Sequence, residues 1–186
     1  KNGLQREQFL PFISTIKKFS IQKELIIKDN YRSKNNEKLQ EIFYPLNKKT
    51  SFRINQRFRE FTRNKKKVRK IVSTKGRDFV IKNFYSGVAR FKFADLCDKN
   101  LGAEDYLEIA KISKFIVIEK IPQFDDINSN QQQRFITLID IIYEKKIPLM
   151  ITSHVNLRSI SSSKSLVEPF KRTISRLYEL TSIDYN

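Results

Sequence analysis

FIVIEKI, residues 115–121, and IPLMITS, residues 147–153, are two short apolar runs on either side of an amphipathic segment. Each run is bounded by polar residues, which is typical of a strand buried on both faces of a sheet. The segment between them shows helical spacing from about residue 131, with an apolar face formed by Phe135, Leu138, Ile139 and Ile142. Because a strand, a helix and a strand of these lengths form a parallel crossover unit, we predict an α/β fold.

Three further strands are expected before this unit, at residues 68–73, 78–82 and 88–93. The last of them is a half-buried strand by its strict alternation, with Ala89, Phe91 and Phe93 on one face and Arg90 and Lys92 on the other. A helix is predicted from Ala103. The sequence therefore predicts a mixed or parallel sheet flanked by helices over residues 68–186.

A closing helix is predicted from about residue 166 to 180. Its inward face carries Phe170, Ile174 and Leu177, and its outward face carries Arg172 and Arg176. Like charges one helical turn apart repel by roughly 0.2 to 0.5 kcal/mol, so something must offset this pair. Glu168 and Glu179 lie one turn away on either side and could do so. The alternative is that the two arginines contact a nucleotide phosphate or an acidic partner.

The first segment has an apolar helical face formed by Phe9, Phe12, Ile13 and Ile16. Pro11 removes a backbone hydrogen bond inside a helix but is tolerated in a first turn, so the regular helix is expected to begin near Leu10 or Pro11. The short run Leu25–Ile27 predicts a buried strand. Lys1 is not a Met, and we expect it to be an internal position of a longer protein.

Residues 33–67 are polar and basic, which is typical of a linker or insertion, and one helix within them is marked by Ile54, Phe58 and Phe61. The stretch from Arg53 to Lys70 holds nine basic residues against Glu60 alone. It predicts either a patch for phosphates or an acidic partner, or a solvated helix face and loop.

The formal charge of +17 would attract nucleic acid, anionic membranes or acidic proteins. A compositional bias of the source genome would give the same charge without a binding role. No apolar run approaches the roughly 18 residues that cross a bilayer, so no transmembrane segment is predicted. One Cys and one His argue against disulfides and a zinc site, and they suit the cytoplasm or the mitochondrial matrix.

The four glycines form neither a GxxxxGK(S/T) loop nor a GxGxxG turn, so residues 1–186 are not expected to hydrolyse nucleotide by themselves. His154 follows a buried strand, where α/β proteins often place active groups, but it is interpreted as a loop histidine. Cys97 is interpreted as a packed, inert thiol. Asp125 and Asp126 lie in a polar loop and are interpreted as solvated acids.

Five segments together resemble the ZapE-type ATPases of bacterial cell division, whose mitochondrial relatives are the AFG-like ATPases. In chain order they are NGLQREQFLPFI (2–13), DNYR (29–32), GVARFKFADLCDKNLGAEDYLEIA (87–110), QRFITLIDIIYEKKIPLMIT (133–152) and FKRTISRLYEL (170–180). The resemblance covers nearly the whole chain and corresponds to the C-terminal half of such a protein. The chain departs from the family pattern at Gln133 and His154, so neither is given a role.

The resemblance implies that residues 1–32 end a P-loop AAA-type core, that 33–67 are a basic linker, and that 68–186 form a C-terminal α/β region. It implies that Arg6 corresponds to the arginine finger that such ATPases present to a neighbouring subunit's nucleotide. The resemblance also implies that ATP and Mg²⁺ are cofactors and that the protein forms a homo-oligomer. It implies a polymer of the tubulin-like cell-division protein as the partner. The competing hypothesis is a basic nucleic-acid-binding α/β module without enzymatic activity, and a third is a purely structural scaffold domain.

Overall fold

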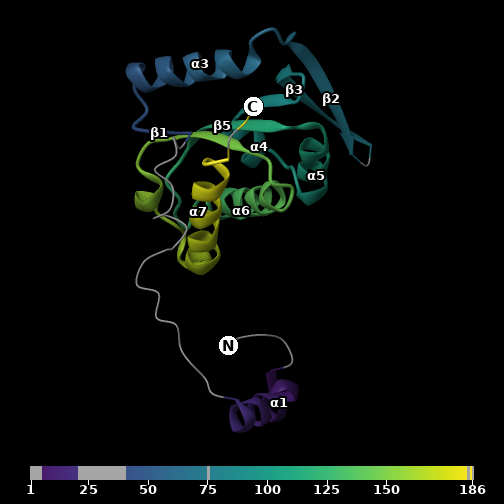
Figure 1. The fold of residues 1–186 in the computed structure, drawn as a ribbon, viewed down its shortest axis with the longest axis vertical. Helices are drawn as coiled ribbons and strands as arrows, with labels where there is room; N and C mark the ends of the chain where they lie inside the picture. The colour runs from purple at the N-terminus through teal and green to yellow at the C-terminus, as the bar shows by residue number, and fades with distance from the viewer. Residues whose placement is uncertain (1–5, 21–40, 75, 184, 186) are drawn as a thin grey trace. The chain divides into compact units, whose positions relative to one another are not determined.

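The computed structural model describes residues 6–20, 41–74, 76–183 and 185 (Figure 1). The chain divides into two compact units, residues 1–30 and residues 31–186. In the first unit, the described residues form helix α1 (Arg6–Phe19) and end at Ser20. The predicted strand at Leu25–Ile27 lies outside the described residues.

Helix α1 begins at Arg6, so the prediction that it starts near Leu10 or Pro11 is wrong. Pro11 lies inside the helix, where it removes one backbone bond to residue 7 while the following turns continue. The hydroxyls of Ser14 and Thr15 donate to the Pro11 carbonyl, at 2.7 and 3.0 Å. Arg6 is therefore in the first turn of the helix, rather than ahead of it.

The second unit is built on a six-stranded sheet in the order β1-β6-β5-β4-β3-β2. The strands are β1 (Ile42–Phe43), β2 (Val68–Thr74), β3 (Arg77–Tyr85), β4 (Val88–Lys92), β5 (Phe115–Ile121) and β6 (Leu149–Ser153). Neighbours among β1, β6, β5 and β4 are parallel, whereas β2, β3 and β4 are joined as antiparallel pairs. The sheet is therefore mixed, as the sequence predicts.

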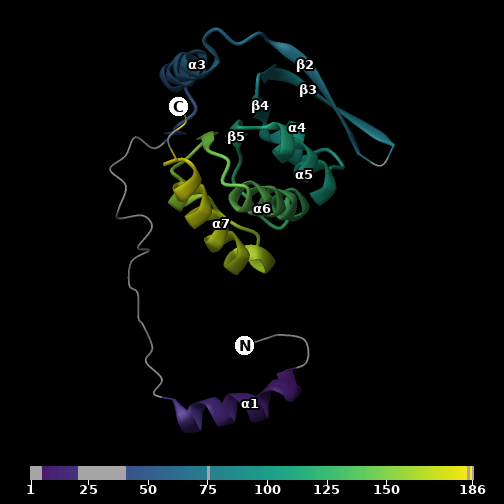
Figure 2. The same cartoon turned by 45° about the vertical axis from the view of Figure 1, so that its right-hand side comes forward.

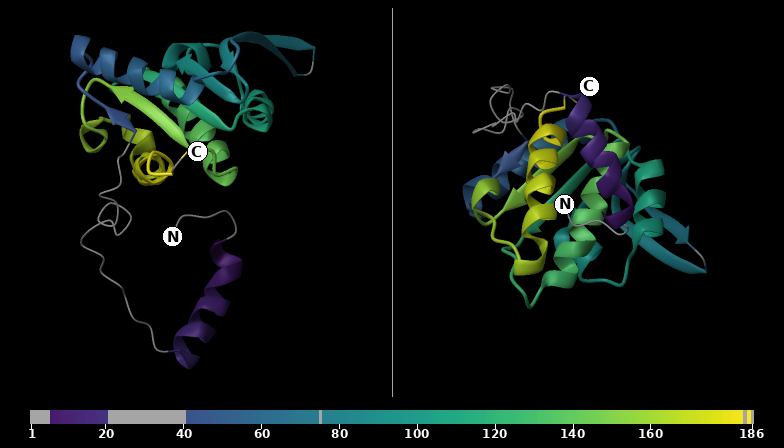
Figure 3. Two further views of the ribbon diagram at one scale, coloured as in Figure 1. Left: turned by 45° about the horizontal axis from the view of Figure 1, so that its top comes forward. Right: turned by 90° about the horizontal axis from the view of Figure 1, so that it is seen from below.

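Helices cover both faces of this sheet (Figures 1 and 3). Helix α3 (Lys48–Thr62) lies along one face. The opposite face carries α4 (Phe93–Cys97), α5 (Ala103–Ile112), α6 (Ser129–Glu144) and α7 (Val167–Leu180). Two short 3₁₀ turns, Leu157–Ser159 and Lys164–Leu166, connect β6 to α7.

The crossover unit that the sequence predicts is confirmed by β5, α6 and β6, because β5 and β6 pair in parallel with Ile116 opposite Leu149. Ile116 and Ile118 face the larger core under α5, α6 and α7, while Phe115 and Val117 face α3. Strand β5 is thus buried on both faces.

The predicted strand 88–93 ends one residue early. Phe93 begins α4 and turns its ring into the aromatic group of Phe124 and Phe135, at centroid distances of 5.7 and 5.6 Å. The described part of residues 33–67 also belongs to this unit. Strand β1 pairs with β6, and Ile54 and Phe58 of α3 are buried against the sheet.

Candidate functional site

Helix α3 presents one apolar and one basic face. Asn47 caps its first turn, accepting a hydrogen bond from the Thr50 backbone N–H at 2.9 Å. Ile54 and Phe58 pack with Phe115 and other side chains on the sheet. Because Ile54 and Phe58 face the sheet, the rotation of α3 about its axis is fixed. The basic residues on its other sides must then face solvent.

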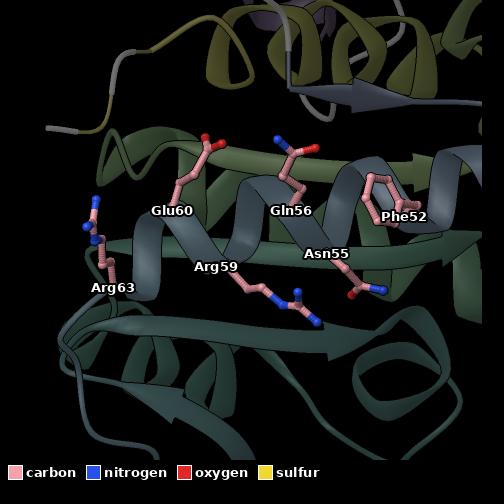
Figure 4. A pocket seen from close by; sticks show the side chains of 6 residues that line it. All are labelled: Phe52, Asn55, Gln56, Arg59, Glu60 and Arg63. Carbon is pink, nitrogen blue, oxygen red and sulfur yellow. The ribbon is translucent and has the colours of Figure 1, made fainter.

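A hollow of about 400 Å³ lies over the exposed side of α3 (Figure 4). It is lined by Phe52, Asn55, Gln56, Arg59, Glu60 and Arg63. Asn55 and Arg59 project from one side of the helix, whereas Gln56 and Glu60 project from the other. Phe52 is 68% exposed, which is unusual for a phenylalanine.

The carboxylates of this region are occupied by one arginine. Arg57 Nε donates to Glu41 at 2.6 Å, and Arg57 Nη1 donates to Glu60 at 2.8 Å. The hydrogen bond to Glu60, followed by the interactions with Glu41, raises the pKa of Arg57 above its ordinary value against the effect of burial. Within the described ranges no carboxylate contacts Arg59 or Arg63, so these guanidinium groups are available to a ligand.

A second cavity, of about 220 Å³, lies where β3 and β4 separate. The strands are joined by the turn Ser86–Gly87, whose φ angles of 46° and 93° suit a two-residue hairpin. Among the described residues they pair only next to this turn, at Phe84 with Ala89 and at Tyr85 with Val88. The β2–β3 hairpin then projects away from the parallel strands (Figure 2). The basic side chains that line the opening are Lys82, Arg90, Lys92 and Lys99.

Arg90 connects this cavity to α3. Its guanidinium makes a two-pronged ion pair with Glu119, at 2.8 and 2.7 Å, and donates to Asn55 Oδ1 at 2.9 Å. It also lies 4.7 Å from the centre of the Phe58 ring. Arg90 therefore holds α3, β4 and β5 together, and its own charge is satisfied. Lys99 pairs with Asp95 at 3.9 Å, so the unpaired charge among the described residues of the cavity is carried by Lys82 and Lys92.

The arginines of α7 have an internal partner. Arg172 Nη2 donates to Asp140 Oδ2 of α6 at 3.1 Å, and Arg176 forms an ion pair with the other oxygen of the same carboxylate. Arg176 was predicted to face outward, but its side chain is only 15% exposed and lies over the Tyr143 ring at 4.7 Å. Asp140 thus offers both arginines a carboxylate that offsets their mutual repulsion, a role that the sequence had suggested for Glu168 and Glu179.

The remaining predicted site residues are dispersed. Arg6 is the first residue of α1, in the other compact unit, and its side chain lies outside the described part of the structure. His154 is exposed directly after β6. Burial is the main cause that raises the pKa of the fully buried Cys97 thiol, which agrees with an inert, packed cysteine.

Asp125 and Asp126 organise their loop. Asp125 Oδ1 accepts hydrogen bonds from the backbone N–H groups of Ile127 and Asn128, at 2.8 and 3.1 Å. Asp126 Oδ1 accepts one from the Lys164 N–H at 2.8 Å. Both residues are exposed, as interpreted from the sequence, and their carboxylates also cap backbone N–H groups of the loop.

No group of three His, Cys, Asp or Glu side chains that could hold a metal ion occurs among the described residues. Nor does any helix within the described ranges have the length and apolarity to cross a membrane.

Sequence reasoning missed two features of this surface. Lys82 and Lys92 were not connected with the basic stretch 53–70, although a count of charges by region would have grouped them. Asp140 was not recognised as the partner of the α7 arginines, because no local spacing links it to residues more than thirty positions away.

Comparison with known proteins gives matches over most of the chain. "Lactation elevated protein 1 homolog B" of Danio rerio is 29% identical over 160 residues, which is 84% of this chain and 32% of that protein. "Cell division protein ZapE" of Escherichia coli K12 is 24% identical over 185 residues, which is all of this chain and 49% of that protein. The chain spans about half, or less, of the length of these curated relatives. No solved structure gives a significant match.

The mixed sheet, with its crossover unit and helices on both faces, defines an α/β protein. A family model described as AFG1-like ATPase matches residues 1–186. The chain therefore belongs to the AFG1-like ATPase family, and the resemblance to ZapE-type ATPases is confirmed.

Proposed function

We propose that this chain is part of an ATPase that binds and hydrolyses ATP with Mg²⁺, and that a phosphate-binding loop outside residues 1–186 holds the nucleotide. The observation that carries the proposal is the family match over the whole chain. Residues 1–186 contain no GxxxxGK(S/T) loop, so in this proposal they would not be active alone.

In this proposal Arg6 supplies the arginine finger to the nucleotide of a neighbouring subunit, and the working unit is a homo-oligomer. A guanidinium that reaches the γ-phosphate stabilises the charge that develops during phosphoryl transfer, and such fingers contribute about 10³ to 10⁵ in rate. A position in the first turn of α1 suits this role, because a helix end fixes the backbone that carries the side chain.

The contribution of Arg6 is tested in the whole protein with Arg6→Ala. We expect ATP binding to be retained within about threefold and turnover to fall by about 10³ or more. Lys18→Ala, on the same helix, is the matched control and should leave both unchanged. Equal losses of binding and turnover would show instead that Arg6 serves folding, and absence of Mg²⁺-dependent turnover in the unaltered protein would refute the ATPase itself.

The proposed target is a polymer of the tubulin-like cell-division protein, since one relative is named a cell division protein. We place the activity in the cytoplasm, with the mitochondrial matrix as the alternative. With ATP, the whole protein should reduce the amount of polymer that sediments, and Arg6→Ala should not. Unchanged sedimentation with an active ATPase would redirect the search to another substrate.

A phosphate contact by Arg172 or Arg176 is the second role that the sequence predicts. Asp140 now offers both arginines a partner within the chain. Any phosphate would have to displace it from them, which makes Arg172, the more exposed of the two, the better candidate for a partner contact.

A further inference from the structure

The positive charge of the chain is concentrated in one region. Residues 41–92 hold 16 of the 37 Lys and Arg and only 3 of the 20 Asp and Glu. Residues 93–186 hold 12 Lys and Arg and 13 Asp and Glu. A genomic bias toward lysine would act on both regions, so it does not account for this difference. A local cause is needed.

Cations of the basic region lie on three adjoining parts of one surface. Its members without a carboxylate partner among the described residues include Arg53, Arg59 and Arg63 on α3, Lys66, Lys67 and Arg69 on the following segment and β2, and Lys82 and Lys92 at the β3–β4 cavity. The hydrogen bond from Arg90 to Asn55 joins the first part to the third. We call this set the cationic surface.

We propose that the cationic surface binds the phosphate backbone of nucleic acid. Helix α3 has 15 residues and is therefore about 22 Å long, which matches the axial rise of about six base pairs of a duplex at 3.4 Å each. Its exposed guanidinium groups suit two-pronged contacts to phosphate oxygens. The exposed ring of Phe52, beside them in the α3 hollow, offers a platform on which a base can stack.

The arrangement favours nucleic acid over a membrane or an acidic protein. A membrane-surface helix carries its apolar anchors in one stripe, whereas the exposed apolar side chains here are Phe52 on α3 and Val68 and Ile71 on β2. A path of cations over a helix, a loop and a hairpin matches a polymer of evenly spaced phosphates. The contacts would hold the backbone rather than read a sequence.

Binding is measured by fluorescence anisotropy with the 186-residue chain and without nucleotide, so the result does not depend on ATP hydrolysis. The probes are a labelled 20-nucleotide single-stranded RNA and its duplex, from 50 to 300 mM KCl. With about five phosphate contacts, log Kobs for the single strand should fall against log salt with a slope of about −3 to −4.

Two variants locate the contacts. Arg59→Gln/Arg63→Gln on α3 and Lys82→Gln/Lys92→Gln at the cavity should each weaken binding about tenfold and reduce the steepness of the salt slope by about 1 to 2. Lys145→Gln/Lys171→Gln, outside the cationic surface, makes the same change in net charge and should have little effect. Thermal unfolding of each variant verifies that it is folded.

Three outcomes would overturn the proposal. The first is no salt-dependent binding of either probe at 50 mM KCl. The second is an equal loss in the Lys145/Lys171 control, which would mean that net charge alone attracts the probe. The third is tighter binding of polyglutamate, or of vesicles containing phosphatidylserine, than of RNA at equal charge concentration.

Discussion

Residues 41–92 and residues 93–186 belong to one sheet but use their charges in opposite ways. In the second region several cations pair with carboxylates of the same region, as Arg172 and Arg176 do with Asp140, and Lys171 with Glu168. In the first region Arg57 takes both Glu41 and Glu60, and its neighbours remain unmatched. The proposed phosphate-binding surface rests on this difference, because the later region pairs more of its cations with its own carboxylates than the earlier region does.

The largest expected effect is on the core of the crossover region. Phe135 is fully buried and touches the rings of Phe93 and Phe124. Phe135→Ala should lower the free energy of unfolding by about 3 to 5 kcal/mol, measured by urea denaturation, because it removes buried apolar area and leaves a cavity.

In the basic region, Phe52→Ala makes the same change of side chain as Phe135→Ala does in the core. Phe52 is largely exposed, so its removal should change stability by less than about 0.5 kcal/mol while weakening RNA binding. Comparable destabilisation by the two variants would contradict the division of roles between the regions.

Alkaline pH should act through the same core. Burial is the main cause that raises the pKa of Cys97 above 9.0 and that of Tyr106 above 10.0. The folded protein then keeps both protons while the unfolded chain releases them. Stability should therefore be complete below about pH 8 and fall as pH rises past 9, by up to about 1.4 kcal/mol per pH unit for each group.

Urea denaturation at fixed pH values from 7 to 10.5 measures this profile. In Cys97→Ala the thiol no longer contributes, so the decline should begin nearer pH 10, whatever the effect of the substitution at neutral pH. A level profile in the unaltered chain would show that these groups titrate alike in the folded and unfolded states.

Asp140→Asn should destabilise the fold less than Phe135→Ala does. It leaves Arg172 and the mostly covered Arg176 without their carboxylate, and we expect a loss of about 1 to 2 kcal/mol, between the values for exposed and buried pairs. A double-mutant cycle with Arg176→Gln isolates the pair.

Arg59→Gln is the matched change in the basic region. Arg59 and Arg63 are like charges one turn apart, but Arg59 also lies in the last turn of α3, where a positive charge is favourable, so the substitution should change stability by less than about 0.5 kcal/mol at low salt. A loss of about 1 to 2 kcal/mol in the free energy of unfolding, as expected for Asp140→Asn, would mean that Arg59 has a structural partner.

Much of the fold is predictable because it depends on local patterns. The continuous apolar runs gave β5 and β6, the spacing of Phe135, Leu138 and Ile142 gave α6, and the alternation around Arg90 gave β4. The start of α1 was missed, since a single Pro11 costs the helix one bond without stopping it. The end of β4 was missed because the Phe93 ring has its partners far along the chain.

Part of the candidate site was likewise predictable from the sequence, and part was not. The basic stretch on α3 was visible in the sequence, and so was a segment resembling the one that carries an arginine finger. That Lys82 and Lys92 lie near this stretch was not visible, because it depends on where β3 leaves β4 and on the hydrogen bond from Arg90 to Asn55.

The sequence by itself determined the class of fold, the family to which the chain belongs and the amount of charge, since these depend on residue types and their spacing. Only the tertiary structure decided which charges are neutralised and which remain free. An ion pair needs two groups within about 4 Å, and residues as far apart as 140 and 176 meet only after the sheet has brought their helices together.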